Sequence, residues 1–198
     1  TGGVDGVARG IRRPEMAQTP PQTPATTADA AAPEVPPPPP TDVELAVERF
    51  PGAVVPAWRF ADGIPTVRVA PEHICDAISW LRHRPEGGRR YDMLVDVSGS
   101  HWPDRDDPFE VTYLLHALED SHRIRLKVAV GGDSPAVPSL TSVWALANWP
   151  EREIYDMYGV EFTGHPDLRR IITPNDWEGH PLRKDFPLGE EPVEFQRP

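Results

Sequence analysis

Apolar positions change their spacing along the chain, and each change predicts a different element. Thr41-Asp42-Val43-Glu44 has the form of a capping box and leads into apolar positions up to Phe50, which predicts a short helix over about 42–50. Residues 64–69 alternate between apolar and polar and predict a strand. Pro71 suits the first turn of a second helix that runs to Arg84, with an apolar stripe at Ile74, Ala77, Ile78 and Leu81.

Three runs rich in β-branched and aromatic residues follow, at 91–97, 109–117 and 124–130. Turn-like segments at 98–108 and 119–122 separate them, and the second is short enough for a hairpin. We therefore expect an antiparallel meander with the strand at 64–69 beside it. The predicted fold class is α+β, with a small, mostly antiparallel sheet, helices on one face and an extended Pro-rich C-terminal arm.

The last helical pattern is interrupted by a proline. Ser139 can cap an apolar helix that carries Leu140 and continues through Ala147. Pro150 then restarts the helix as a first-turn residue, and Gly159 ends it.

Composition divides the chain into three parts. Residues 1–40 hold ten prolines among Ala and Thr without a period that could bury a face, which predicts a disordered tail. The chain opens on Thr1 and a Gly/Arg-rich stretch precedes Met16, so we expect residues 1–15 to be an over-extended start. Residues 41–163 form the predicted α+β domain, and residues 164–198 form a proline-punctuated arm.

Charge and cysteine content exclude several classes of function. The chain has 20 basic and 31 acidic residues, a formal net charge of -11, which disfavours nucleic acid or an anionic membrane surface as a direct partner. Cys75 is the single cysteine, which excludes an intrachain disulfide, a four-cysteine zinc site and an iron-sulfur cluster held by this chain alone. The apolar runs are also too short for a membrane-spanning helix.

Motifs for cofactors and catalysis are sparse. No nucleotide-binding glycine loop or nucleophile elbow is present. A metal-dependent enzyme remains an alternative, because four possible ligands lie within a short stretch, although they are scattered through Pro-rich coil rather than set at fixed spacing. These are His165, Asp167, Asp176 and His180.

The acidic residues after Pro150 have a structural interpretation. Glu151 and Glu153 lie in the first helical turn, where the helix dipole stabilises negative charge. Arg152 and Asp156 are four residues apart and are predicted to form an ion pair on one face. A cap and an ion pair thus account for this motif without catalysis.

Residues 164–187 have the composition of a protein-docking surface. They carry equal numbers of basic and acidic side chains, together with the apolar anchors Trp177, Leu182 and Phe186. Because the segment lacks the apolar content for a core of its own, we predict that it lies along a partner subunit and becomes ordered there.

The residues from 150 to 187 resemble the signature of a known family. The motifs are Pro150-Glu151-Arg152-Glu153-Ile154-Tyr155-Asp156-Met157-Tyr158-Gly159, then Gly164-His165-Pro166-Asp167-Leu168-Arg169-Arg170, then Asp176-Trp177-Glu178-Gly179-His180-Pro181-Leu182-Arg183-Lys184-Asp185-Phe186. They are similar to those of the C subunit of the respiratory NADH:quinone oxidoreductase, complex I. Residues 42–130 match that family only in element order, and residues 1–40 do not match it. The chain ends soon after the motif, which indicates the unfused form.

The resemblance implies a cofactor-free structural subunit of the peripheral arm, with flavin and iron-sulfur clusters in partner subunits. It implies packing against the large quinone-pocket subunit and a peripheral position on the cytoplasmic side of a bacterial cell membrane. It implies no catalytic, cofactor-binding or metal-binding residue on this chain. The predicted docking residues are Glu151, Arg152, Glu153, Asp156, His165, Arg169, Arg170, Trp177, His180, Arg183, Lys184 and Phe186.

One alternative keeps the fold and changes the complex. Equivalent subunits occur in energy-converting hydrogenases and in dehydrogenases that do not use NADH. The continuation from Asp176 to Lys184 favours the quinone enzyme, because the related families share less of it.

Overall fold

A computed structural model describes residue 2 and residues 41–57, 61–83 and 88–187. The predictions for the tail, for nearly all of residues 1–15 and for the end of the arm at 188–198 lie outside these residues. Residues 41–187 belong to one compact unit, Pro38–Pro198. None of the helices in the described ranges combines the length and hydropathy needed to cross a membrane.

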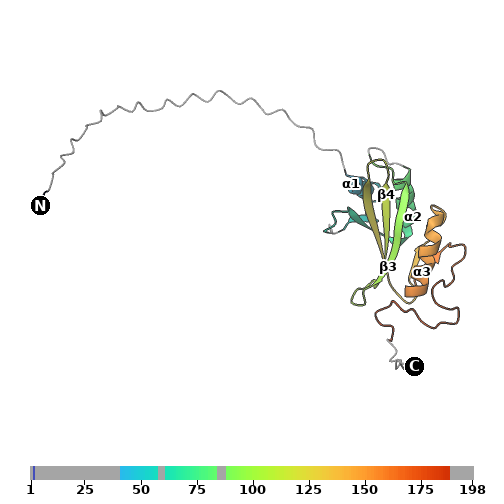
Figure 1. Cartoon of the computed structure of the whole chain (residues 1–198). Coiled ribbons are helices and arrows are strands. Elements are labelled where there is room, and N and C mark those ends of the chain that lie inside the picture. The colour runs from blue at the N-terminus through green and yellow to red at the C-terminus, as the bar shows by residue number, and fades with distance from the viewer. Residues whose placement is uncertain (1, 3–40, 58–60, 84–87, 188–198) are drawn as a thin grey trace, which may run out of the picture. The chain divides into compact units, whose positions relative to one another are not determined.

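The unit combines a twisted sheet with three α-helices (Figure 1). Two further helices, η1 and η2, are short 3₁₀ turns. The elements are α1 (Asp42–Arg49), β1 (Val54–Pro56), β2 (Thr66–Val69), η1 (Pro71–His73), α2 (Ile74–Arg82), β3 (Met93–His101), β4 (Phe109–Ala117), β5 (His122–Val130), β6 (Ala136–Pro138), η2 (Ala145–Ala147), α3 (Asn148–Tyr158) and β7 (Glu161–Thr163).

The main sheet has the strand order β1-β2-β5-β4-β3, and β6 pairs with β7 in a second, two-stranded sheet. β3, β4 and β5 form the predicted antiparallel meander, and β1 is antiparallel to β2. The α+β class is therefore confirmed. β2, however, runs parallel to β5, so the sheet is mixed, because the chain leaves β2 through α2 and returns at the opposite edge of the sheet.

One face of the sheet forms the core. Along β4 and β5 every second side chain is buried, from Val111 to Ala117 and from Ile124 to Val130, while the side chains between them are half-buried or exposed. All three α-helices contribute buried side chains to the same core. This packing fixes α3 beside β3, which is what positions the candidate site.

The end of β3 differs from the sequence-based prediction. β3 continues through 98–101, where a turn was expected, because these residues pair with β4 and because Gly99 lies against α3. A Cβ at Gly99 would lie 2.8 Å from the Tyr158 ring, so only glycine permits this approach.

The helix predicted from Ser139 does not form. Residues 141–143 form a turn, but the backbone of Trp144 is extended (φ -136°, ψ 117°) and interrupts the helix. Ser139 N donates to Thr163 O at 2.9 Å, and Leu140 N donates to the Glu151 carboxylate at 2.7 Å. Helical structure begins only at η2 and α3. Pro150 lies in the first turn of α3 and Gly159 caps its end at φ 72°, as predicted.

Candidate functional site

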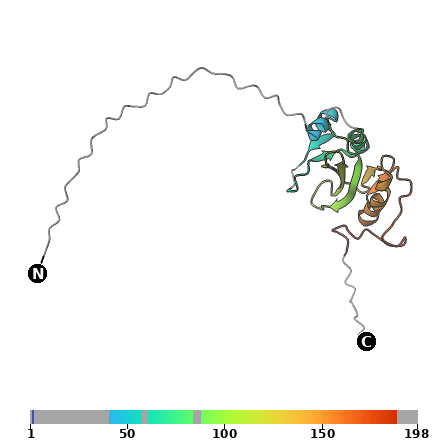
Figure 2. The same cartoon turned by 45° about the horizontal axis from the view of Figure 1, so that its top comes forward.

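The site is built on α3 and on residues 164–187, which follow β7. Although α3 is rich in charge, Glu151, Arg152 and Asp156 are buried together with Ile154 and Met157. Residues 164–187 curve round the C-terminal end of this helix (Figures 1 and 2). The buried charges of α3 thus face the rest of the chain and not solvent.

Glu151 fastens the start of α3 to the preceding loop. Its side chain is fully buried and accepts hydrogen bonds from Ser139 Oγ at 2.6 Å and from Leu140 N at 2.7 Å. Burial raises the pKa of Glu151 to about 7, and these two hydrogen bonds only partly oppose that rise. The residue was predicted to act through the helix dipole, but it acts mainly as a tether between α3 and the loop.

This tether predicts a dependence of stability on pH. Because the folded-state pKa of Glu151 lies above its ordinary value of 4.5, its contribution is complete below pH 4.5 and is lost as pH rises through about 7. The loss is on the order of 3 kcal/mol. Glu151→Gln can accept from Leu140 N and donate to Ser139 Oγ without a charge, so the free energy of unfolding in urea between pH 5 and 8 should show a flatter pH profile. A profile as steep as that of the unmodified chain would contradict this.

Asp156 is the centre of the site. Its carboxylate is fully buried and receives five hydrogen bonds from one short stretch of chain. Oδ1 accepts from Arg170 Nη1 at 2.6 Å and from Thr173 Oγ1 at 2.5 Å. Oδ2 accepts from the amides of Ile171, Ile172 and Thr173 at 3.1, 2.8 and 2.9 Å. One side chain of α3 thus holds the segment that follows β7.

These hydrogen bonds decide the charge state of Asp156. Burial alone would raise the pKa of its carboxyl, but the donors from Thr173, Ile172 and Arg170 hold that pKa far below its ordinary value of 3.8. Its contribution to stability is therefore present above pH 3.8 and is lost as the pH falls. At neutral pH the group is a carboxylate that is fully satisfied by its own chain.

Backbone groups at the end of α3 hold the rest of the segment. The carbonyl of Asp156 lies 2.9 Å from His180 Nδ1, and the Met157 carbonyl accepts from Leu182 N at 3.1 Å. The Tyr158 carbonyl accepts from Arg183 Nε at 2.5 Å. The carbonyls that end a helix without intrahelical partners are thus satisfied by residues 180–183.

Two of the sequence-based predictions about this region are wrong. Arg152 was expected to pair with Asp156, but its guanidinium donates to the carbonyls of Arg169 and Arg170 at 3.1 and 3.3 Å, and Arg170 forms the ion pair with Asp156. The segment was also expected to extend away and to take its shape from a partner. Residues 170–184 instead fold onto α3, because its buried carboxylate and free carbonyls require donors.

The other predicted docking residues differ in exposure. Glu153, Arg169, Trp177 and Lys184 are exposed, whereas His165 and Phe186 are half-buried. His165 Nε2 lies 3.2 Å from the Asn148 carbonyl. Phe186 lies against Gly179, where a Cβ would be 2.7 Å from its ring. The predicted set therefore separates into residues that shape the segment and residues that face outward.

The possible metal ligands are not brought together. His165 contacts the start of α3, His180 contacts its end, and Asp167 pairs with Arg169. Within the described ranges no group of three or more His, Cys, Asp or Glu side chains lies close enough to hold a metal ion.

Two exposed apolar residues were missed by the sequence analysis. Leu146 and Trp149 lie at the junction of η2 and α3 and are 57% and 60% exposed. The signal was present, because both residues occupy positions outside the predicted apolar set, which is Leu140, Val143, Trp144 and Ala147.

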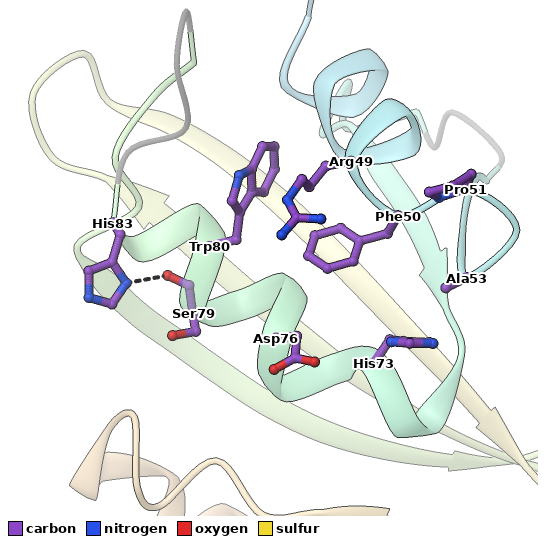
Figure 3. A pocket seen from close by; sticks show the side chains of 9 residues that line it. All are labelled: Arg49, Phe50, Pro51, Ala53, His73, Asp76, Ser79, Trp80 and His83. Carbon is purple, nitrogen blue, oxygen red and sulfur yellow. Dashed lines mark hydrogen bonds between the residues drawn. The ribbon is translucent and has the colours of Figure 1, made fainter.

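A surface hollow of about 640 Å³ lies elsewhere, between α1 and α2 (Figure 3). Phe50 and Trp80 meet edge to face in it, with ring centroids 5.9 Å apart. Its remaining lining residues are Arg49, Pro51, Ala53, His73, Asp76, Ser79 and His83. None of the predicted docking residues lines it.

Comparison with known families identifies the motif on α3. The sequence model of the respiratory-chain NADH dehydrogenase 30 Kd subunit matches residues 67–192. The chain belongs to this family. The resemblance seen in residues 150–187 is thereby confirmed, and the match reaches back to β2.

Curated relatives agree with the assignment. The C subunit of NADH-quinone oxidoreductase from Roseiflexus castenholzii is 46% identical over 156 residues, which cover 79% of this chain and 88% of the relative. The same subunit of Azorhizobium caulinodans is 47% identical over 139 residues, which cover 70% of this chain and 64% of the relative. Both names favour the NADH-quinone enzyme over the hydrogenase alternative.

Solved structures share the fold of this family member. A trypsin-resistant fragment (1-134) of Nqo5 is 28% identical with a TM-score of 0.51, and the match covers 63% of this chain and 94% of the fragment. A chain of the membrane-bound sulfane sulfur reductase, an archaeal respiratory membrane complex, has a TM-score of 0.62 over 74% of this chain and 84% of its own. At 21% identity, the second likeness shows the fold alone.

Proposed function

We propose that this chain is a supporting subunit in the peripheral arm of proton-translocating NADH:quinone oxidoreductase and packs against the large quinone-pocket subunit. In this proposal electrons pass through flavin and iron-sulfur clusters in partner subunits, and this chain supplies neither cofactors nor catalytic residues. The complex holds it at the cytoplasmic side of a bacterial membrane. Family membership supports the choice of complex.

Exposed apolar side chains on residues 164–187 support the proposed docking role. The buried groups of α3 fold residues 164–187 onto the domain, and this leaves large apolar side chains facing outward. Ile172, Trp177 and Leu182 are 59%, 43% and 49% exposed. Apolar side chains that are exposed on a prefolded scaffold are typical of protein-docking surfaces.

The predicted docking residues then take two different roles. Arg152, Asp156, Arg170, His180 and Arg183 position the segment through contacts within the chain, whereas Glu151 holds the loop at Ser139 and Leu140. Glu153, Arg169, Trp177 and Lys184 are exposed and are the ones we propose for contact with a partner. A preformed segment loses less conformational entropy on binding than one that must fold on its partner.

Recovery of the complex from detergent-solubilised membranes tests the function. The tagged full-length chain is expected to bring down subunits that contain flavin and iron-sulfur clusters. Trp177→Ser should lower that recovery at least tenfold, because an exposed aromatic anchor is lost. The matched control is Val55→Ser in β1, whose exposure of 44% is close to the 43% of Trp177. Recovery of none of these subunits with the unmodified chain would overturn the proposal.

A further inference from the structure

An exposed stripe crosses the junction between η2 and α3. Leu146 and Trp149 are 57% and 60% exposed, and Glu153 is exposed one turn further along. Residues spaced by three and four positions share one face of a helix. The three side chains therefore form one continuous surface, which we call the Leu146–Glu153 stripe.

The Trp149 side chain packs against the guanidinium of Arg152. The guanidinium carbon of Arg152 lies 5.2 Å from the centroid of the Trp149 ring system. Arg152 is only 7% exposed, and its guanidinium is bound to the carbonyls of Arg169 and Arg170. The indole thus rests on an immobilised cation, which reduces the entropy that binding would cost. Fixed, exposed Trp side chains are typical anchors of protein interfaces.

The exposed carboxylate of Glu153 predicts a positive charge on the partner surface. It is exposed, and among the residues that the structure describes it has no ion-pair partner. A carboxylate beside an apolar anchor needs an opposite charge across an interface, because an unpaired charge would lose its hydration on binding.

We propose that the Leu146–Glu153 stripe is a second docking face, occupied by a neighbouring subunit of the same oxidoreductase. The complementary surface is an apolar cleft that receives Trp149 and Leu146, with a Lys or Arg at its rim opposite Glu153. This inference rests on the proposed function and adds the chemistry of the partner.

The position of the stripe distinguishes it from the first docking surface. Ile172 and Leu182 are bound through their amides to Asp156 and Met157, near the C-terminal end of α3. The stripe lies at the N-terminal end of the same helix. α3 has 11 residues and is therefore about 16 Å long, so the two surfaces lie at opposite ends of a helix of that length.

The test compares matched surface variants in the assembled complex. Trp149→Ser, Leu146→Ser and Glu153→Lys are introduced into the tagged full-length chain, and co-purified subunits are quantified from solubilised membranes. We expect recovery to fall at least tenfold for Trp149→Ser and at least threefold for each of the other two. The control is Leu118→Ser between β4 and β5, whose exposure of 58% is close to that of Leu146. It should change recovery less than twofold.

Two outcomes would overturn the docking face. Recovery with Trp149→Ser and Leu146→Ser equal to that with Leu118→Ser would show that the stripe faces solvent. A purified chain that sediments as a dimer, with Trp149→Ser returning it to a monomer, would make a second copy the occupant. Thermal unfolding of the Leu146→Ser chain is measured as well. An unchanged melting temperature would show that a loss of recovery does not come from misfolding. If Trp177→Ser disrupts assembly and the stripe variants do not, only this inference fails.

Discussion

Replacing Asp156 by Ala is expected to lower the free energy of unfolding by about 3–5 kcal/mol, the range seen when one member of a buried ion pair is removed. The substitution leaves the Arg170 guanidinium without its carboxylate and leaves three backbone amides without an acceptor. Urea unfolding at pH 7 measures the change. Limited proteolysis should at the same time show faster cleavage within residues 165–187, because Asp156 holds that segment to α3.

A matched control separates this effect from a general loss of charge. Asp167→Ala removes an exposed carboxylate that pairs with Arg169 at 2.9 Å, and exposed pairs of this kind contribute at most about 1 kcal/mol. Asp156→Asn retains one oxygen acceptor and should lie between the two. Equal stability of the Asp156→Ala and Asp167→Ala chains would refute the role assigned to Asp156.

Gly159→Ala is expected to cost about 2–4 kcal/mol, for two reasons that add. Gly159 has φ 72°, a backbone conformation that disfavours any side chain. A Cβ there would also lie 2.5 Å from His180 Nε2 and still closer to Arg183, so both side chains would have to move. Because these residues satisfy the last carbonyls of α3, the end of the helix should fray.

The control for Gly159 is another glycine with the same backbone requirement. Gly164 has φ 81°, and a Cβ added there would have no heavy atom within 4 Å, so Gly164→Ala should cost only the conformational term of about 1–2 kcal/mol. Urea unfolding of both chains gives the difference that the packing of His180 and Arg183 contributes. A difference of zero would mean that these side chains adapt freely.

Features that depend on nearby residues could be predicted from the sequence. The capping box at Thr41 forms both of its hydrogen bonds, at 2.7 and 3.3 Å, because both partners lie within one helical turn. β4 has the predicted bounds, since apolar alternation and flanking turns define it locally. Gly159 ends α3 for a similarly local reason, its left-handed conformation.

Features that depend on distant residues could not be predicted. Asp156 pairs with Arg170, 14 positions further on, and not with the helix neighbour Arg152. Helical spacing favoured Arg152, but the spacing does not show that residues 170–173 fold back over α3. In the same way, the pattern from Ser139 to Ala147 predicts a helix, but the extended backbone at Trp144 interrupts it.

The separation of the predicted docking residues into buried and exposed groups could not be predicted from the sequence. Charged residues such as Asp156 and Arg152 were assigned to a partner because of the family resemblance, yet both are buried. Trp149, in contrast, is exposed although its side chain is apolar. Both exposures depend on which face of α3 packs against the sheet. The helical period does not reveal that face when apolar residues occur on both sides of the helix.

The Asp156 carboxylate also determines where the polypeptide can be divided. All five of its hydrogen-bond donors come from residues 170–173, which are synthesised after α3. A fragment that stopped between Gly159 and Arg170 would have to bury an ion without counter-charge or release the helix from the sheet. A truncation that keeps α3 therefore has to include residues 170–173, and during biosynthesis α3 can pack fully only after these residues have been made.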